Sequence, residues 1–216
     1  MSSTRRRKRP VQLGLQLRTW GGARQGAGRK PKGEQAGIAH LRRPRLAARC
    51  PVHVTLRMLP HVWSLRSRRS FRVFARAVHA AAERFGMRVC EFSVQGNHLH
   101  LVVEATDRTA LSRGMKGLGV RLAKGLNKLM SGKGQVLADR YHEHILRTPS
   151  EVKRAVSYVR RNHAKHVAER GGRLDAGSVD SYSSAGTEHG IVLPTPRTWL
   201  LGQSARVLAE RAHGRG

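Results

Sequence analysis

The sequence predicts an α+β fold in which an antiparallel sheet carries helices on one face, and three observations support this prediction. Apolar residues alternate with polar ones in several short segments, which is the period of a strand. In other segments they recur every three or four residues, which is the period of an amphipathic helix. The segments follow in the order strand, helix, strand, strand, helix, strand, helix. The first six form the β-α-β-β-α-β pattern of ferredoxin-like domains, and the seventh is an extra C-terminal helix.

The first half of this pattern lies between residues 52 and 104. Alternation over 52–58 predicts a strand that ends before Pro60. The helix that follows carries the apolar stripe Phe71, Phe74, Val78, Ala81 and Phe85. Gly86 after this stripe is typical of a helix C-terminus. The segments 87–94 and 98–104 are strand-like, and the turn-forming residues between them predict a hairpin.

The second half consists of a helix, a strand and the extra helix. Leucine and methionine recur at helical spacing over 111–129, although four glycines there each cost about 1 kcal/mol relative to alanine. We therefore expect this helix to depend on its neighbours. Residues 136–147 indicate another strand. Thr148, Pro149 and Glu151 form a capping box with proline at the first helical position, which predicts a last helix from Pro149 to about Arg170.

The composition points to a polyanionic partner. The 216 residues include 42 Lys and Arg against 13 Asp and Glu, a formal net charge of +29, so nucleic acid is the first partner to consider. No apolar run approaches the roughly 18 residues of a membrane span, and we expect no secretory signal because no apolar segment follows the basic N-terminus. Cys50 and Cys90 lie in strand-like contexts and favour a reducing compartment. We expect a cytoplasmic, nucleoid-associated protein.

The uneven charge predicts three regions. Residues 1–48 are rich in arginine and lysine and are expected to form a flexible basic tail. Residues 49–170 are expected to be the folded domain, and 171–216 a polar linker with a short C-terminal segment. In the tail, the run 26–33 resembles an AT-hook, which lies in the minor groove of A·T-rich DNA. The alternative is an arm that contacts phosphates without sequence preference.

His98 and His100 are candidate metal ligands. Residues i and i+2 of a strand project from one face, so both imidazoles can bind one divalent ion while Leu99 points into the core. The spacing alone is a weak signal, because His142 and His144 form a second such pair. The hydrophobic strand around the first pair favours it, and ordinary surface histidines are the alternative.

Tyr158 is a candidate nucleophile. At 100° per residue it falls about 120° from the centre of the apolar stripe of the last helix, beside Arg154, Asn162 and Lys165. A tyrosine hydroxyl among cations can attack a phosphodiester. Asn162, one turn on, can complete a metal site or orient the phosphate. The alternative is a tyrosine that covers the edge of the core and turns its hydroxyl to water.

A further set of histidines raises the question of structural zinc. It comprises His142, His144, His163 and His166. Nothing in the sequence brings the helical pair to the strand pair, and solvated or phosphate-contacting histidines suit a chain this basic better.

Taken together, these motifs resemble a known family. The run from Val94 to Glu104, Val-Gln-Gly-Asn-His-Leu-His-Leu-Val-Val-Glu, is followed by Asp139-Arg140-Tyr141 and then by Tyr158-Val-Arg-Arg-Asn162. This joint pattern resembles the HUH single-tyrosine transposases of small bacterial insertion sequences, and most closely their REP-associated tyrosine transposase branch. The resemblance covers about residues 50–170. His163 stands where the family usually has proline.

The resemblance implies a catalytic domain at 49–170 that acts on single-stranded or hairpin DNA. His98, His100 and Asn162 would bind Mg²⁺ or Mn²⁺, and Tyr158 would form a covalent 5′-phosphotyrosine and release a 3′-hydroxyl. The basic residues expected to contact DNA are Arg29, Lys30, Lys32, Arg140, Arg154, Arg161 and Lys165.

Two other functions remain open at this point. A non-catalytic DNA- or RNA-binding protein on the same fold would use the charge and the sheet but not Tyr158. A metal-dependent nuclease would use the histidines and release free ends. The sequence also leaves open whether the site forms within one chain or across a homodimer.

Overall fold

The fold is seen in a computed structural model that describes residues 43–81, 83–169, 171–173, 178–186 and 191–203. Its four named strands are β1 (Val52–Arg57), β2 (Met87–Val94), β3 (His98–Ala105) and β4 (His142–Ile145). They form one antiparallel sheet in the order β2-β3-β1-β4. Its helices are α1 (Arg68–Ala81), α2 (Arg108–Leu129) and α3 (Pro149–Glu169), with a 3₁₀ turn, η1, at Arg84–Gly86.

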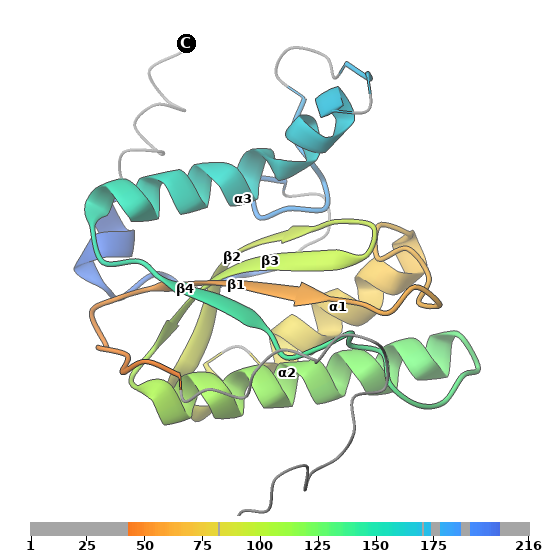
Figure 1. Ribbon diagram of the computed structural model, residues 1–216, viewed down its shortest axis with the longest axis horizontal. Coiled ribbons are helices and arrows are strands. Elements are labelled where there is room, and N and C mark those ends of the chain that lie inside the picture. The colour runs from red at the N-terminus through yellow and green to blue at the C-terminus, as the bar shows by residue number, and fades with distance from the viewer. Residues whose placement is uncertain (1–42, 82, 170, 174–177, 187–190, 204–216) are drawn as a thin grey trace, which may run out of the picture. The chain divides into compact units, whose positions relative to one another are not determined.

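The helices cover the two faces of the sheet unequally. α1 and α2 lie side by side on one face, and α3 lies across the other (Figure 1). The predicted α+β fold with its additional C-terminal helix is therefore confirmed. Because successive residues of a strand point to opposite faces, β1 and β3 each contribute side chains to both layers.

The core has two parts. The larger part lies between the sheet and the α1–α2 pair and contains Leu99 and Leu101 of β3. The smaller part lies under α3 and consists of Cys90, Val102, Leu146, Val152, Ala155, Val156, Val159, Leu200 and Leu201. Full burial of one such valine or leucine contributes about 1.5–3 kcal/mol, so this smaller core fixes α3 on the sheet.

Two predicted boundaries are wrong. The first helix ends at Ala81 and does not extend to Phe85, a residue that is 52% exposed. Glu83, Phe85 and Gly86 have φ values of 55°, 59° and 73°, a left-handed backbone that cannot continue an α-helix. The strand expected over 136–147 is only four residues long, because Leu137 makes no more than an isolated bridge to Met58.

The C-terminal segments pack onto this domain. The Tyr182 carbonyl accepts from the Val94 N–H at 2.8 Å, and the Ser184 N–H donates to the Phe92 carbonyl at 2.9 Å. Residues 182–184 therefore run along the outer edge of β2. Asp180 accepts two hydrogen bonds from Arg66, at 2.7 and 3.1 Å. The polar stretch expected to be a linker is thus partly bound to the sheet.

Two simpler expectations concern cysteines and membranes. Cys50 and Cys90 are both buried free thiols. Within the described residues, every helix is too short or too polar to cross a membrane.

Candidate active site

The register of β1 and β3 gathers polar side chains beneath α3. Thr55 lies opposite His100, and Arg57 lies opposite His98. Directly opposed residues in an antiparallel pair share a face, so these four side chains project together. Leu99, between the two histidines, points into the larger core instead. In the structure, as the strand period predicts, His98 and His100 project from one face of β3 and Leu99 projects from the other.

The two ring nitrogens of His100 differ, because Nδ1 lies within hydrogen-bond distance of neighbouring side chains and Nε2 has no hydrogen-bond partner. Its Nδ1 lies 3.2 Å from Thr55 Oγ1 and 3.3 Å from His53 Nε2. Its Nε2 is buried without a hydrogen-bond partner, and the residue is only 6% exposed. An imidazole held through Nδ1 presents Nε2 in the manner of a metal ligand.

The electrostatic surroundings keep His100 neutral. Burial, with added repulsion from His53, His98 and His166, lowers the pKa of His100 to about 3. A neutral imidazole carries one N–H and one nitrogen lone pair. With the Nδ1–H donating to Thr55 Oγ1, the lone pair stays on Nε2, which can therefore coordinate a metal at neutral pH.

His98 is held in a similar way at the start of β3. Its Nδ1 lies 2.9 Å from the Asn97 Oδ1, so the Nδ1–H donates to that oxygen and Nε2 carries the lone pair. Burial, followed by the nearby His166 and Arg57, lowers the pKa of His98. The ring centroids of His98 and His100 are 4.8 Å apart, with the rings nearly perpendicular.

The start of α3 is set by the predicted capping box. The Glu151 N–H donates to Thr148 Oγ1 at 3.2 Å, and the Thr148 N–H donates back to Glu151 Oε2 at 3.2 Å. Each contact satisfies a backbone N–H that the first turn leaves unpaired.

An ion pair anchors the middle of α3 to β2. Arg160 donates to both carboxylate oxygens of Glu91, at 2.6 and 3.0 Å. The Ser184 hydroxyl donates to the same carboxylate. A bidentate arginine fixes orientation as well as distance. Arg160 lies between Tyr158 and Asn162 in sequence, so this pair sets the rotation of the helix at the site.

Tyr158 lies directly over the strand histidines. Its ring centroid is 5.2 Å from that of His100 and 5.9 Å from that of His53, both in edge-to-face arrangements. The residue is 37% exposed. It borders an open depression of about 310 Å³ that is also lined by Arg154 and His144. The tyrosine is therefore packed on the candidate ligands and still reachable from solvent.

Asn162 faces the same histidines. Residues 158, 162 and 166 recur at i+4 and so lie along one side of α3. Tyr158 contacts His100 at one end of this row. At the other end, the ring centroids of His166 and His98 are 5.9 Å apart. Asn162 between them is 1% exposed, and both its amide nitrogen and its amide oxygen lack a hydrogen-bond partner. Such a buried amide costs about 1–3 kcal/mol unless something binds it.

Three residues of this cluster, His53, Thr55 and His166, are not among the site residues that the sequence predicts. His53 and Thr55 alternate with the apolar residues of β1, a signal that becomes informative only once β1 is known to pair with β3. The sequence indicates His166 only as a member of a structural zinc set. Among the described residues there is no group of three or more His, Cys, Asp or Glu that could hold a metal. The predicted set differs in kind, because its third member is an amide.

The predicted DNA contacts are distributed over two elements and the tail. Three of them are exposed on α3, namely Arg154, Arg161 and Lys165. The Nζ of Lys165 lies 3.7 Å from the Oε1 of Glu169. Arg140 is exposed in the turn before β4. The remaining predicted contacts lie outside the described residues: Arg29, Lys30 and Lys32.

Comparisons with known proteins give matches among solved structures. No family model and no curated protein sequence matches the chain. The chain is similar to the structure of a REP-associated tyrosine transposase bound to a REP hairpin, with a TM-score of 0.50 and 15% identity over 69% of this chain and 97% of that one. A candidate transposase from Deinococcus radiodurans R1 matches with a TM-score of 0.39 and 12% identity, over 65% of this chain and 99% of that one. The first likeness confirms the fold that the motif resemblance implies.

Proposed function

We propose that this chain is a transposase that nicks single-stranded or hairpin DNA and transfers strands through Tyr158. One observation carries the proposal: a half-exposed tyrosine packs on a buried histidine with an unused Nε2, one helical turn from a buried, unpaired asparagine amide. The shared fold with a tyrosine transposase bound to a hairpin supports the same reading.

The residues present fit a divalent metal. His98 and His100 offer imidazole nitrogens and Asn162 offers an amide oxygen, a mixed set that suits Mn²⁺ and, through the oxygen, Mg²⁺. The unpaired atoms of His100 and Asn162 are buried polar groups that such an ion would satisfy. When bound, the ion would polarise the scissile phosphate and stabilise charge on its oxygens.

The chemistry of the chain's own residues follows. The Tyr158 oxygen forms a bond to phosphorus and loses its proton, while the bond from phosphorus to the 3′ oxygen breaks and that oxygen leaves as a hydroxyl. The product is a 5′-phosphotyrosine that conserves the phosphodiester, so a 3′-hydroxyl can reverse the step without ATP. Thr55 and His53 hold His100 in place during this exchange.

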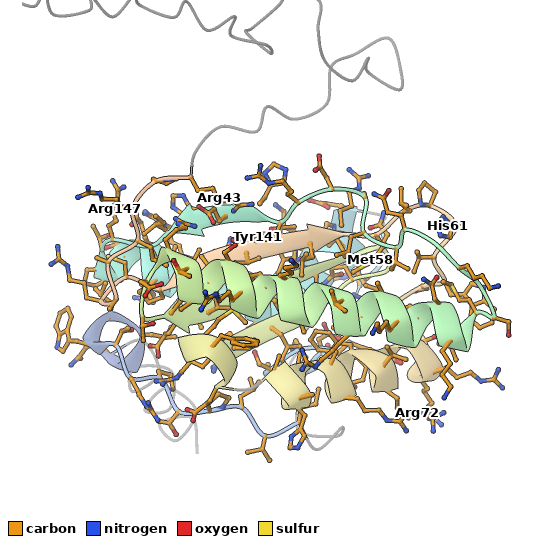
Figure 2. The ribbon with its side chains drawn as sticks, turned by 90° about the horizontal axis from the view of Figure 1, so that it is seen from below. Arg43, Met58, His61, Arg72, Tyr141 and Arg147 are labelled. Carbon is orange, nitrogen blue, oxygen red and sulfur yellow. The ribbon has the colours of Figure 1, made fainter. Side chains whose placement is uncertain are left out.

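A covalent-capture assay with a hairpin oligonucleotide labelled at its 3′ end tests the proposal. In Mn²⁺, the wild-type chain should yield a labelled protein adduct on a denaturing gel, and Tyr158→Phe should bind the hairpin and yield none. Tyr141→Phe is the matched control, because Tyr141 packs against the core on the α1–α2 side (Figure 2). It should give wild-type adduct.

Each other result of this assay has a definite meaning. Normal adduct from Tyr158→Phe would move the nucleophile elsewhere and overturn the assignment. Hairpin binding by the wild-type chain with neither adduct nor cleavage would indicate a non-catalytic nucleic-acid-binding protein. Cleavage to free ends without adduct would indicate a metal-dependent nuclease.

A further inference from the structure

The two helices on the other face of the sheet carry cations without acids. Neither α1 nor α2 contains an aspartate or a glutamate. Their arginines and lysines are Arg68, Arg69, Arg72, Arg76, Arg108, Arg113, Lys116, Arg121, Lys124 and Lys128. In the described part of the chain, Arg108 is the one member of this set with a carboxylate partner, Glu143 at 2.6 Å.

The cations form a stripe on each helix. In α2 they recur from Arg113 to Lys128 at spacings of three to five, which keeps them on one side of a helix. Most are exposed, and Figure 2 views this side of the molecule, with Arg72 at its margin. Fifteen residues of helix span roughly 22 Å, over which one strand of B-form DNA carries about six phosphates.

The two stripes meet in a groove. Gly125 of α2 has no Cβ, and a Cβ there would collide with Val73 of α1, so glycine lets the helices approach closely. The groove above this contact has a volume of about 490 Å³ and is lined by the cations Arg69, Arg72, Arg76 and Lys128. A second, separate depression of about 530 Å³ lies along α2, and its lining includes the cations Arg113, Lys116, Arg121 and Lys124.

Repulsion among so many like charges lowers the stability of the folded chain when no polyanion is bound. Exposed helices commonly alternate acids with bases, because i to i+4 pairs are favourable and like charges at that spacing are unfavourable. Repulsion among the unpaired cations here is relieved by a polyanion, and regularly spaced phosphates match charges spaced along a helix.

We propose that the α1–α2 surface binds the phosphate backbone of duplex DNA, on the side of the sheet opposite Tyr158. The inference rests on the proposed function in taking DNA as the polyanion, and it adds a second contact region to it. The surface holds a duplex arm by sequence-independent contacts while the unpaired strand reaches the tyrosine.

The test compares two double variants of the full chain. Arg72→Gln with Lys128→Gln removes one cation from each side of the first groove. Lys153→Gln with Arg173→Gln removes two exposed cations on and just after α3 and is the matched control. Binding to a blunt DNA duplex is measured by fluorescence anisotropy across a salt series, and covalent capture is measured with an unpaired oligonucleotide.

For the groove variant we expect roughly 10- to 30-fold weaker duplex binding near 0.15 M salt and a slope of log K against log salt that is shallower by about 1.8, since each lost phosphate contact contributes about 0.9. Its adduct yield should equal that of the wild-type chain. Equal losses in both double variants, or an unchanged slope, would overturn the inference. So would unchanged duplex affinity with weakened binding to phosphatidylserine vesicles, which would assign the surface to a membrane.

The two proposals can fail separately. If the wild-type chain forms adduct and the groove variant binds duplex normally, the surface assignment fails and the function stands. If the groove variant loses duplex affinity and the wild-type chain forms no adduct, the surface assignment stands and the function fails.

Discussion

Replacing Asn162 with leucine should stabilise the metal-free chain and remove its response to divalent metal. Asn162 is fully buried, and neither of its amide atoms has a hydrogen-bond partner. An unsatisfied buried amide costs about 1–3 kcal/mol, and an apolar side chain of similar shape removes that cost. We therefore expect Asn162→Leu to raise the free energy of unfolding by about 1–3 kcal/mol, or Tm by roughly 3–10 °C for a domain of this size.

Thermal unfolding followed by circular dichroism measures this effect, first in EDTA and then in Mn²⁺. Mn²⁺ that binds only the folded state at 100 times its Kd stabilises it by about 2.7 kcal/mol, so the wild-type Tm should rise with metal and the Asn162→Leu Tm should stay flat. Asn127→Leu is the matched control. Its amide donates to the Gly134 carbonyl at 2.9 Å, so its loss should lower stability by about 0.5–1.5 kcal/mol without changing the metal response.

Two results would refute this reasoning. A lower Tm for Asn162→Leu in EDTA would mean that the amide makes favourable contacts in the metal-free fold. An equal rise with Mn²⁺ in the variant and the wild-type chain would mean that Asn162 does not hold the ion.

Three further predictions concern α2 and α3. Gly117→Ala should stabilise the chain by about 0.5–1 kcal/mol through helix propensity, since a Cβ there meets the movable end of Arg121 at 3.1 Å and makes an ordinary van der Waals contact with Phe85 at 3.6 Å. Gly114→Ala should destabilise it by about 1–2 kcal/mol in urea unfolding, because its Cβ would meet a buried methionine sulfur at 2.5 Å. Backbone N–H donation by Arg147 and then Thr148 lowers the pKa of Glu151 from its ordinary 4.5. The stability that wild type has over Glu151→Gln should therefore be complete above pH 4.5 and fall as the pH drops through the lowered value, and a difference that grows in acid would contradict this.

Local patterns were sufficient for most of the fold. The hairpin turn before His98 and the capping box at Thr148 depend on neighbouring residues, and both are present where the sequence predicts them. The end of α1 was mispredicted because Phe85 continues the apolar spacing of the helix, whereas the backbone at Glu83 has already turned left-handed. The strand over 136–147 was overestimated because apolar content does not reveal where a strand leaves its partner.

The candidate site divides in the same way. His98 and His100, and likewise Tyr158 and Asn162, are close in sequence, so strand and helix periodicity reveal their shared faces. The contribution of His53 depends on the register between β1 and β3, and that of His166 on how α3 crosses the sheet. Long-range relations of this kind leave no periodic trace in a single sequence.

The pairing of residues 182–184 with β2 has a consequence for how copies of the chain can associate. An outer strand with free N–H and C=O groups is a template for pairing with another molecule. On β2 part of that template is already used, by the hydrogen bonds of Phe92 and Val94 to the chain's own C-terminal segment. The other outer strand, β4, is only four residues long. Two copies can therefore extend the sheet mainly through the short strand β4. A chain cut before Asp180 would leave the outer N–H and C=O groups of β2 unpaired and should aggregate more readily.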